Sequence, residues 1–172
     1  MKSVVRFSVA LLIVLALGAC KSAPEAQPEA APTPSTPPPV DTSGAPDPRD
    51  YTDARNFDNP ESLLSKRVIY FDFDKSTVRP EFRGIIAAHA AYMTAHTSAR
   101  VTLEGHADER GTREYNIALG ERRANSVRDY MVANGISSFR IESVSYGEEQ
   151  PVAYGSGESN WAQNRRVELK PQ

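Results

Sequence analysis

Between residues 101 and 131 the spacing of apolar residues changes, and this change constrains the fold more than any other feature of the sequence. Apolar and polar residues alternate from Val101 to His106, which is the pattern of a half-buried strand. Beyond Gly111 the apolar residues recur every three or four positions, as on one face of a helix: Ile117, Gly120, Ala124, Val127 and Met131. The sequence therefore predicts a strand, a polar loop and a helix.

The predicted loop is rich in polar and ionisable side chains, namely His106, Asp108, Glu109, Arg110 and Thr112. Ligands of α/β sheets bind at the carboxyl ends of strands, and this loop follows such an end. At about 100° per residue, Asn116, Leu119 and Arg123 share one strip of the helix beside its apolar stripe. A solvent-facing arc is predicted for Glu121, Arg122, Asn125, Arg128 and Asp129. Arg123 is thus expected at the seam between helix and sheet.

A carboxylate at Asp108 and a guanidinium at Arg123, facing one cleft, would suit a zwitterionic ligand. The carboxylate accepts hydrogen bonds from an ammonium group, and the guanidinium binds a carboxylate through two parallel hydrogen bonds. We expect both side chains to flank the core, so that Asp108→Asn and Arg123→Lys weaken binding without unfolding the domain. Asp74, after an earlier strand, is expected at the same sheet edge. Each residue has a structural alternative: a turn or cap for Asp74, an Asx turn for Asp108 and a surface ion pair for Arg123.

The rest of the domain is predicted to continue this alternation of strands and helices. The elements are a strand over 68–74 with Ile69, Phe71 and Phe73 on one face, a helix from Pro80 whose buried stripe includes a hydrogen-bonded His89, a strand over 141–146, a loop over 147–160 and a strand over 166–170. Arg165 and Arg166 are expected to form a basic rim or to block a sheet edge. The order βαβαββ predicts an α/β two-layer sandwich with helices packed on one mixed sheet.

Five motifs occur along the domain in a fixed order: FDFDKS, GHADERGT, EYNIALGERRANSV, VSYGEEQP and NRRVEL. They closely resemble the OmpA-like peptidoglycan-binding domain family, and within it the lipoproteins of the Tol–Pal system. The resemblance implies a non-enzymatic domain that binds the meso-diaminopimelate of the peptidoglycan stem peptide. The ligand contacts it implies are Phe73, Asp74, Asp108, Arg110, Thr112, Asn116, Leu119 and Arg123.

The N-terminus has the pattern of an export signal. Lys2 and Arg6 precede an apolar run over 7–19, which has the size of a signal-peptide core and is too short to span a bilayer comfortably. The run ends in LGAC, which resembles a bacterial lipobox and implies cleavage before Cys20 and lipid on that residue. Lys21 then suggests an outer-membrane anchor, with the domain in the periplasm. A secretory signal with a chance cysteine is the alternative.

A proline-rich segment separates Cys20 from the domain. Residues 21–50 contain nine of the chain's 13 prolines, which predicts a disordered tether that partly adopts the polyproline II conformation. A docking motif for a partner is the alternative. We divide the chain into a signal peptide over 1–19, the lipidated cysteine and tether over 20–60 and the binding domain over 61–172. Three apolar side chains before the first strand are expected to pack onto the domain: Phe57, Leu63 and Leu64.

Composition and motifs exclude several other functions. A net charge of −2 and a pI near 5.9 leave no electrostatic footprint for nucleic acid, and a single cysteine excludes an intramolecular disulfide. Glu104, His106 and Asp108 suggest a metal cluster or an acid–base pair, but no HExxH, GxSxG or P-loop accompanies them. We therefore predict no enzyme, no metal and no cofactor.

The resemblance also implies partners and a cellular role. Besides peptidoglycan, it implies the periplasmic β-propeller protein of the Tol system as a partner, and a role in envelope integrity and outer-membrane constriction at cell division. The alternative is a periplasmic scaffold lipoprotein that binds partners and for which wall binding is secondary.

Overall fold

The computed structural model describes residues 44–172, so the predictions for the signal peptide, for Cys20 and for residues 21–43 of the tether lie outside the described part of the chain. The strands are β1 (Val68–Tyr70), β2 (Val101–His106), β3 (Ile141–Gly147) and β4 (Arg166–Pro171). The α-helices are α1 (Arg83–Ala95), α2 (Arg113–Ala133) and α3 (Glu158–Asn164). Short 3-10 turns η1 (Ala54–Phe57), η2 (Leu63–Ser65), η3 (Pro80–Phe82) and η4 (Ser138–Arg140) connect them.

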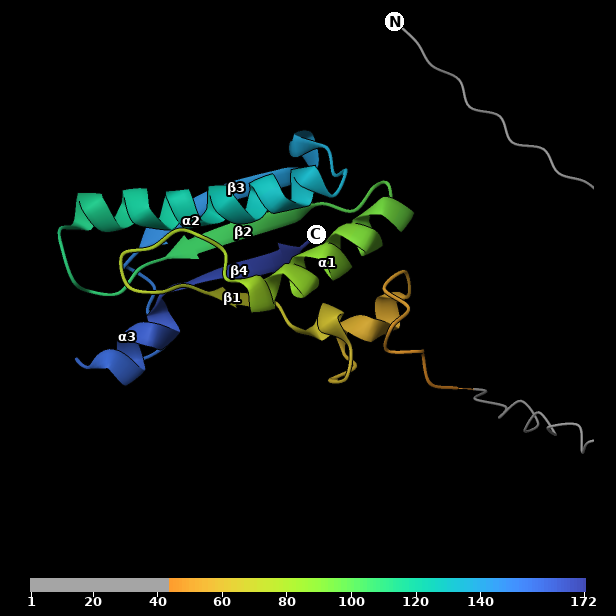
Figure 1. Ribbon diagram of the computed structural model, residues 1–172, viewed down its shortest axis with the longest axis horizontal. Helices are drawn as coiled ribbons and strands as arrows, with labels where there is room; N and C mark the ends of the chain where they lie inside the picture. The colour runs from red at the N-terminus through yellow and green to blue at the C-terminus, as the bar shows by residue number, and fades with distance from the viewer. Residues whose placement is uncertain (1–43) are drawn as a thin grey trace, which may run out of the picture. The chain divides into compact units, whose positions relative to one another are not determined.

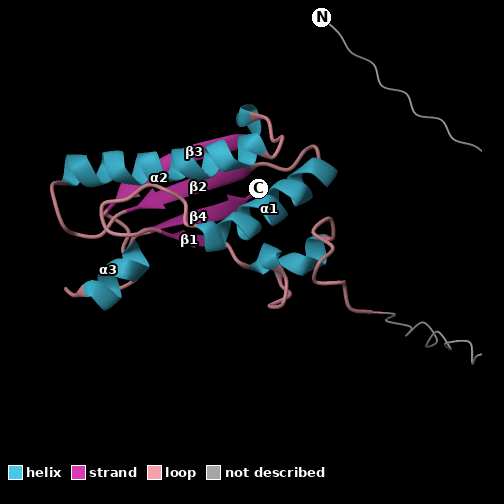
Figure 2. Ribbon diagram, in the orientation of Figure 1, coloured by secondary structure: helices cyan, strands magenta, loops and turns pink. Residues whose placement is uncertain are grey.

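The strands form one mixed sheet in the order β1-β4-β2-β3. β2 and β3 are parallel, whereas β4 runs antiparallel to both β1 and β2. β1 and β2 therefore point the same way, and their carboxyl ends lie at one edge of the sheet. α1 and α2 cover one face of the sheet, while α3 lies beyond one end (Figures 1 and 2). The predicted sandwich and its βαβαββ order are confirmed, with α3 added between β3 and β4.

The hydrophobic core fills the space between α1, α2 and the sheet. Its members alternate along the strands and recur along the helices, as the two periodicities require: Ile69, Phe71, Ile86, Met93, Val101, Leu103, Ala124, Val127, Met131, Val167 and Leu169 are among them. α2 approaches β2 most closely where Gly120 faces Gly105, because a Cβ on either glycine would overlap the backbone of the other. This close contact sets the height of α2 above the sheet, and Arg123 follows in the next turn.

The first strand is shorter than predicted. β1 ends at Tyr70, and Phe73, predicted on the same strand face as Ile69 and Phe71, is 53% exposed. After Phe71, whose N–H donates to the carbonyl oxygen of Arg165 at 2.9 Å, the chain turns, and the N–H of Lys75 donates to the carbonyl oxygen of Asp72 at 3.2 Å. Because of this turn, Phe73 and Asp74 do not pair in the sheet, and both line a pocket at the edge where the strands end.

Two further predictions about the C-terminal third are wrong. The segment over 147–160 is not all loop, because α3 begins at Glu158. Arg165 and Arg166 form neither an exposed rim nor an edge block, since both are buried and β4 is an interior strand. Arg165, which precedes β4, donates to the carbonyl oxygen of Phe71 and to Asp108, while Arg166 donates to Glu168 and to the carbonyl oxygen of Gln150.

The segment before β1, on both sides of the predicted domain boundary at 61, packs against the folded body. The ring of Phe57 lies edge-on to Tyr92 of α1 at a centroid distance of 4.8 Å, and Leu64 is completely buried. The predicted hydrogen bond of His89 is present, because its Nε2 lies 3.0 Å from the carbonyl oxygen of Lys66. Among the helices of residues 44–172, none has the length and apolarity needed to cross a membrane.

Candidate ligand-binding site

A pocket of about 210 Å³ opens at the sheet edge where β1 and β2 end. It is lined by Phe73, Asp74, Asp108, Arg110, Gly111, Tyr115, Asn116 and Leu119. The structure thus brings together six of the eight predicted contact residues. Thr112 and Arg123 are not in the pocket wall, and Tyr115 is a wall residue that the sequence analysis missed. Its only local signal was its place in the first turn of the helix, one residue before Asn116.

Asp74 reaches the pocket through an unusual backbone conformation. Its φ of 54° lies in the left-handed region, and no other non-glycine residue among 44–172 has a positive φ. Aspartate is one of the side chains that tolerate this conformation. The hydroxyl of Tyr115, from the first turn of α2, donates a hydrogen bond to Asp74 Oδ1. The loop after β1 and the start of α2 are therefore joined across the pocket.

Asp108 is buried, and both of its carboxylate oxygens already accept hydrogen bonds. Oδ1 accepts from the backbone N–H of Arg110 at 3.1 Å and from its Nε at 3.0 Å, while Oδ2 accepts from Arg110 Nη2 at 2.6 Å and from Arg165 Nη1 at 3.2 Å. Burial pulls the pKa of Asp108 upward, but these hydrogen bonds together outweigh burial and hold the pKa below its usual value. Asp108 is therefore ionised and balanced by two guanidinium groups.

α3 completes this charge network, which the sequence analysis did not foresee. Glu158 accepts from Arg165 Nη2 at 2.5 Å and lies 3.7 Å from Arg110 Nη2. The carboxylates of Asp108 and Glu158 therefore alternate with the guanidinium groups of Arg110 and Arg165 in a closed ring. Trp161 packs over Arg110 with the guanidinium carbon 4.1 Å from the ring centroid, and Phe73 packs against Arg110 at 3.8 Å. The Arg110 guanidinium is held between two aromatic rings, an arrangement that favours a cation.

Arg123 lies behind the pocket wall and is the largest fully buried side chain of residues 44–172. Its Nε, Nη1 and Nη2 donate to the carbonyl oxygens of Lys75 at 2.8 Å, His106 at 2.7 Å and Asp72 at 3.2 Å. Burial lowers the pKa of Arg123 to about 10, which leaves it protonated at neutral pH. The prediction that Arg123 flanks the core is wrong, because the turn after β1 and the end of β2 close over it. Two of its five N–H groups have no partner within residues 44–172.

The other predicted residues support the wall. Thr112 is the N-cap of α2, and its Oγ1 accepts from the N–H of Tyr115 at 3.2 Å. The buried amide of Asn116 donates to Glu148 from the loop after β3. Leu119 is 6% exposed and supplies an apolar wall. Thr112 thus determines where α2 begins, and thereby which side chains face the pocket.

His106 lies on the other side of the sheet. Its place at the end of the alternating pattern is confirmed, and its place in the polar loop is wrong: it is the last residue of β2, and its ring stacks on Tyr146 at a centroid distance of 5.6 Å. Only 1% of His106 is exposed, and neither ring nitrogen has a hydrogen-bond partner within the described chain. Burial, and then the charge of Arg166, lowers the pKa of His106 to about 4. His106 therefore reaches the site only through its carbonyl oxygen, which accepts from Arg123.

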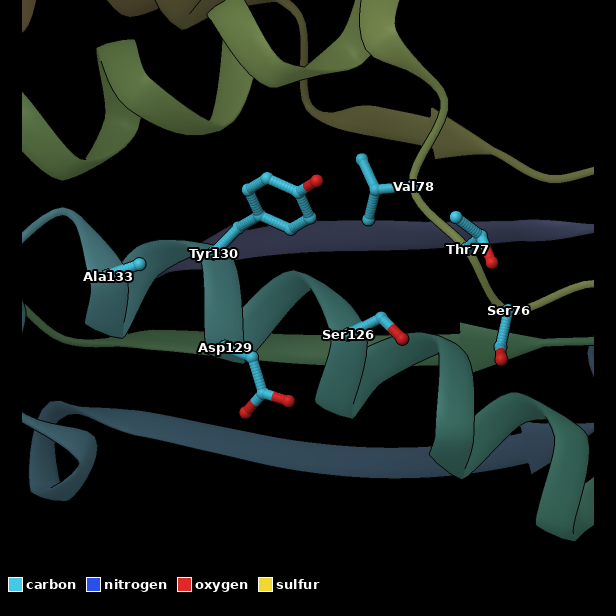
Figure 3. Close-up of a pocket in the computed structure, with 7 residues that line it drawn as sticks. All are labelled: Ser76, Thr77, Val78, Ser126, Asp129, Tyr130 and Ala133. Atoms are coloured by element: carbon cyan, nitrogen blue, oxygen red, sulfur yellow. The ribbon is translucent and has the colours of Figure 1, made fainter.

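A second groove, of about 360 Å³, lies between the loop at 76–78 and the second half of α2. Figure 3 shows the residues that line it, with the ring of Tyr130 extending toward Val78: Ser76, Thr77 and Val78 on the loop, and Ser126, Asp129, Tyr130 and Ala133 on the helix. Asp129 is the only charged side chain that lines this groove. The groove lies away from the strand ends, where Asp74, Asp108 and Arg110 meet. The smaller pocket is therefore the stronger candidate for a charged ligand.

The fold and the pocket define a small α/β domain with a polar ligand site at one sheet edge. The sequence profile of the OmpA family matches residues 70–165, which is more than half of the chain. The chain belongs to the OmpA family.

Three relatives illustrate how close the similarity is. The chain is 52% identical over 109 residues to the peptidoglycan-associated lipoproteins of Pseudomonas putida and Pseudomonas aeruginosa, covering 63% of this chain and 65% and 64% of those proteins. It also resembles the crystal structure of the peptidoglycan-associated lipoprotein from Burkholderia pseudomallei, with a TM-score of 0.66, 43% identity and coverage of 67% of this chain and 98% of that one. The chain thus matches slightly less than two thirds of the length of the two Pseudomonas proteins.

Proposed function

We propose that the domain binds peptidoglycan noncovalently, by holding the zwitterionic end of meso-diaminopimelate in the stem peptide. The observation that carries the proposal is the pocket at the ends of β1 and β2, which joins the carboxylates of Asp74 and Asp108 to the guanidinium of Arg110. The names of the Pseudomonas relatives, both peptidoglycan-associated lipoproteins, support the same ligand class.

The charges of the pocket match the two ends of the ligand. Asp74 and Asp108 are proposed to bind the ammonium group. Because Arg110 already occupies both oxygens of Asp108, the ammonium must share Asp108 with Arg110 or displace it. The Arg110 side chain is 30% exposed, so it can turn outward and pair with the ligand's carboxylate. Phe73 and Leu119 form apolar walls for the methylene chain between the two ends.

Arg123 is proposed as a second partner for the carboxylate, through its two N–H groups that lack partners within residues 44–172. Since Arg123 is fully buried, this contact requires the pocket wall near Leu119 to open. Asn116 is proposed to orient the ligand, and Thr112 to contribute its hydroxyl at the helix start. The role is one of binding: muropeptides should be retained and not cleaved.

Calorimetric titration with a diaminopimelate stem peptide tests this proposal. Asp74→Asn keeps the shape and tolerates the left-handed backbone, but it removes the charge, so affinity should fall about ten- to a hundredfold. Glu121→Gln, on the exposed face of α2, makes the same chemical change and should not alter affinity. A lysine stem peptide lacks the second carboxylate and should bind poorly. Equal affinity of Asp74→Asn and the unchanged protein for the diaminopimelate peptide would exclude the site.

We further propose that the whole protein is an outer-membrane lipoprotein, anchored by lipid on Cys20, which links the membrane to the cell wall. The LGAC sequence and the names of the relatives support the anchor. Labelled fatty acid should enter the unchanged protein but not Cys20→Ser, and equal labelling of both would refute lipidation at Cys20.

A place in the Tol–Pal system, with the Tol-system β-propeller protein as partner and a role in constriction at division, rests on the resemblance of the motifs. The alternative is a partner-binding scaffold in which wall binding is secondary. Cells that carry Asp74→Asn distinguish the two: envelope leakage and defective constriction are expected if wall binding is primary. A normal envelope despite lost wall binding would favour the scaffold.

A further inference from the structure

Tyr115 connects the first turn of α2 to the loop after β1, directly at the mouth of the pocket. It lines the pocket, and its hydroxyl donates a hydrogen bond to Asp74 Oδ1 across 41 residues of sequence. We infer that Tyr115 is a positioning residue of this site, whose hydroxyl holds the Asp74 carboxylate toward the ammonium group of the ligand. The inference rests on the proposed function and assigns to Tyr115 a role that the family motifs do not imply.

Asp74 needs such a partner because little else restrains it. The residue is exposed, follows a loop and has a φ of 54°, and Tyr115 is its only side-chain hydrogen-bond partner within residues 44–172. A free carboxylate in this place would populate several rotamers, and binding would have to order it. The hydrogen bond orders the carboxylate before the ligand arrives.

Tyr115 is itself held in place from three sides. Its N–H is capped by Thr112, and the guanidinium carbon of Arg122 lies 5.5 Å from the centroid of its ring. The ring also lies beside Gly111, where a Cβ would be 3.5 Å from Tyr115 Cδ1. The hydrogen bond to Asp74, and then burial, raises the pKa of Tyr115, so the phenol remains a proton donor at neutral pH. Arg122, predicted on the solvent-facing arc of the helix, thus contacts the site through Tyr115.

The two carboxylates of the pocket differ because their partners differ. Asp108 is paired with two cations, Arg110 and Arg165. Asp74 is paired with a neutral hydroxyl, which orders the carboxylate but does not cancel its charge. Asp74, held by Tyr115, therefore supplies the uncompensated negative charge that attracts the ammonium.

The test measures binding of the diaminopimelate stem peptide to the full-length protein by calorimetry. Tyr115→Phe removes only the hydroxyl and should lower the affinity three- to tenfold. Tyr130→Phe is the matched control, because Tyr130 is on the same helix, stacks with Arg83 and faces the other groove (Figure 3). The control should bind within twofold of the unchanged protein, and both variants should melt at similar temperatures.

A double-mutant cycle separates positioning from direct contact. In an Asp74→Ala background, Tyr115→Phe should change affinity by less than twofold, because the hydroxyl acts through the carboxylate. The same loss in both backgrounds would show that Tyr115 contacts the ligand itself and would overturn the inference. A Tyr115→Phe variant that binds as tightly as the unchanged protein would also overturn the inference.

A measurement on the free protein keeps the inference separate from the proposed function. In NMR titration of labelled tyrosines, the pKa of Tyr115 should lie above the ordinary value and should fall toward it in Asp74→Ala. If the unchanged protein does not bind the peptide, the proposed function fails while this titration still decides whether Tyr115 holds Asp74. An ordinary Tyr115 pKa that Asp74→Ala does not change would overturn the inference whatever the peptide does.

Discussion

Arg123 occupies the place of a core residue although it carries a charge. It is fully buried, and it compensates for its lost hydration with hydrogen bonds to three backbone carbonyl groups, two from the turn after β1 and one from the end of β2. The planar guanidinium reaches all three because its donors diverge in a fixed fork. Arg123 therefore ties α2 to both loops that form the pocket, whether or not it also touches the ligand.

Arg123→Lys should destabilise the fold, contrary to the sequence-based prediction that it does not unfold the domain. A compact ammonium cannot reach three diverging carbonyls, and each buried group left unpaired costs about 1–3 kcal/mol. We expect a loss of roughly 2–4 kcal/mol in urea unfolding. Arg128→Lys, on the same helix with a loose ion pair to Asp129, should cost less than about 0.5 kcal/mol. Equal stability of the two variants would contradict the role assigned to Arg123.

His106 should make the domain sensitive to acid. The pKa of His106 is lowered from 6.5 to about 4 in the folded protein. Between these two pH values the imidazole is protonated in the unfolded chain but not in the folded one. Stability is then lost as the pH falls from 6.5 toward 4, by up to about 3 kcal/mol. His106→Phe keeps a ring against Tyr146 and should flatten this pH dependence between pH 6.5 and 4.5, measured by urea unfolding.

Three other groups also have lowered pKa values, one histidine and two carboxylic acids. Burial also lowers the pKa of His89, so some acid sensitivity should remain in His106→Phe. The carboxylates of Asp108 and Glu168 have lowered pKa values and contribute only at lower pH. An unchanged slope between pH 6.5 and 4.5 in His106→Phe would mean that His106 is not the main group.

At the scale of elements, the contact between α2 and β2 positions the pocket. A Cβ on Gly120 would lie 2.8 Å from the carbonyl oxygen of Gly105 and would also overlap Ser145 Oγ. Backbone cannot rotate away as a side chain can, so the helix must move. Since α2 carries Tyr115, Asn116 and Leu119, any such movement also displaces the pocket wall.

Gly120→Ala should therefore destabilise the domain, by about 3 kcal/mol, although alanine is the better helix former. Gly84→Ala is the control: it is also within a helix, but its Cβ would lie an ordinary 3.7 Å from Leu63 Cδ1. It should stabilise by about 0.5–1 kcal/mol. Thermal unfolding of the two variants measures the difference, and a loss below 1 kcal/mol in Gly120→Ala would show that α2 can shift without cost.

At the scale of the whole molecule, the segment before β1 belongs to the folded body. Leu64 is completely buried, Phe57 packs on α1, and the carbonyl group of Lys66 satisfies His89. Burial of one leucine side chain contributes about 1.5–3 kcal/mol, so this segment supplies a substantial part of the stability of a small domain.

A chain that begins at residue 68 should therefore melt roughly 10 °C below one that begins at residue 44, because it loses about 3 kcal/mol of packing. A chain that begins at Cys20 should melt at the same temperature as the chain that begins at residue 44, because the composition of residues 21–43 predicts a tether that adds no core. Calorimetry of the three chains compares them directly. Equal melting of the chains from 44 and from 68 would show that the segment only rests on the surface.

The sequence by itself determined the strands and helices whose apolar residues recur with a regular spacing. The alternation from Val101 to His106 and the stripe from Ile117 to Met131 identify β2 and α2, because a side chain's face depends only on its own element's period. The handedness rule for crossovers then placed Asp74 and Asp108 at the same edge of the sheet, since right-handed crossovers bring the carboxyl ends of parallel strands to one edge. Most of the pocket wall followed from these two facts and from the motifs.

Tertiary structure alone decided the features that depend on which distant segments meet. β4 lies between β1 and β2, so Arg166 begins an interior strand, and the buried Arg165 donates to the carbonyl oxygen of Phe71 and to Asp108. The carbonyl groups around Arg123 and the hydroxyl that holds Asp74 likewise come from parts of the chain 17 to 51 residues away. A local period tells which face a side chain occupies but not which atoms lie opposite it, because long-range pairing is decided by the packing of the whole chain.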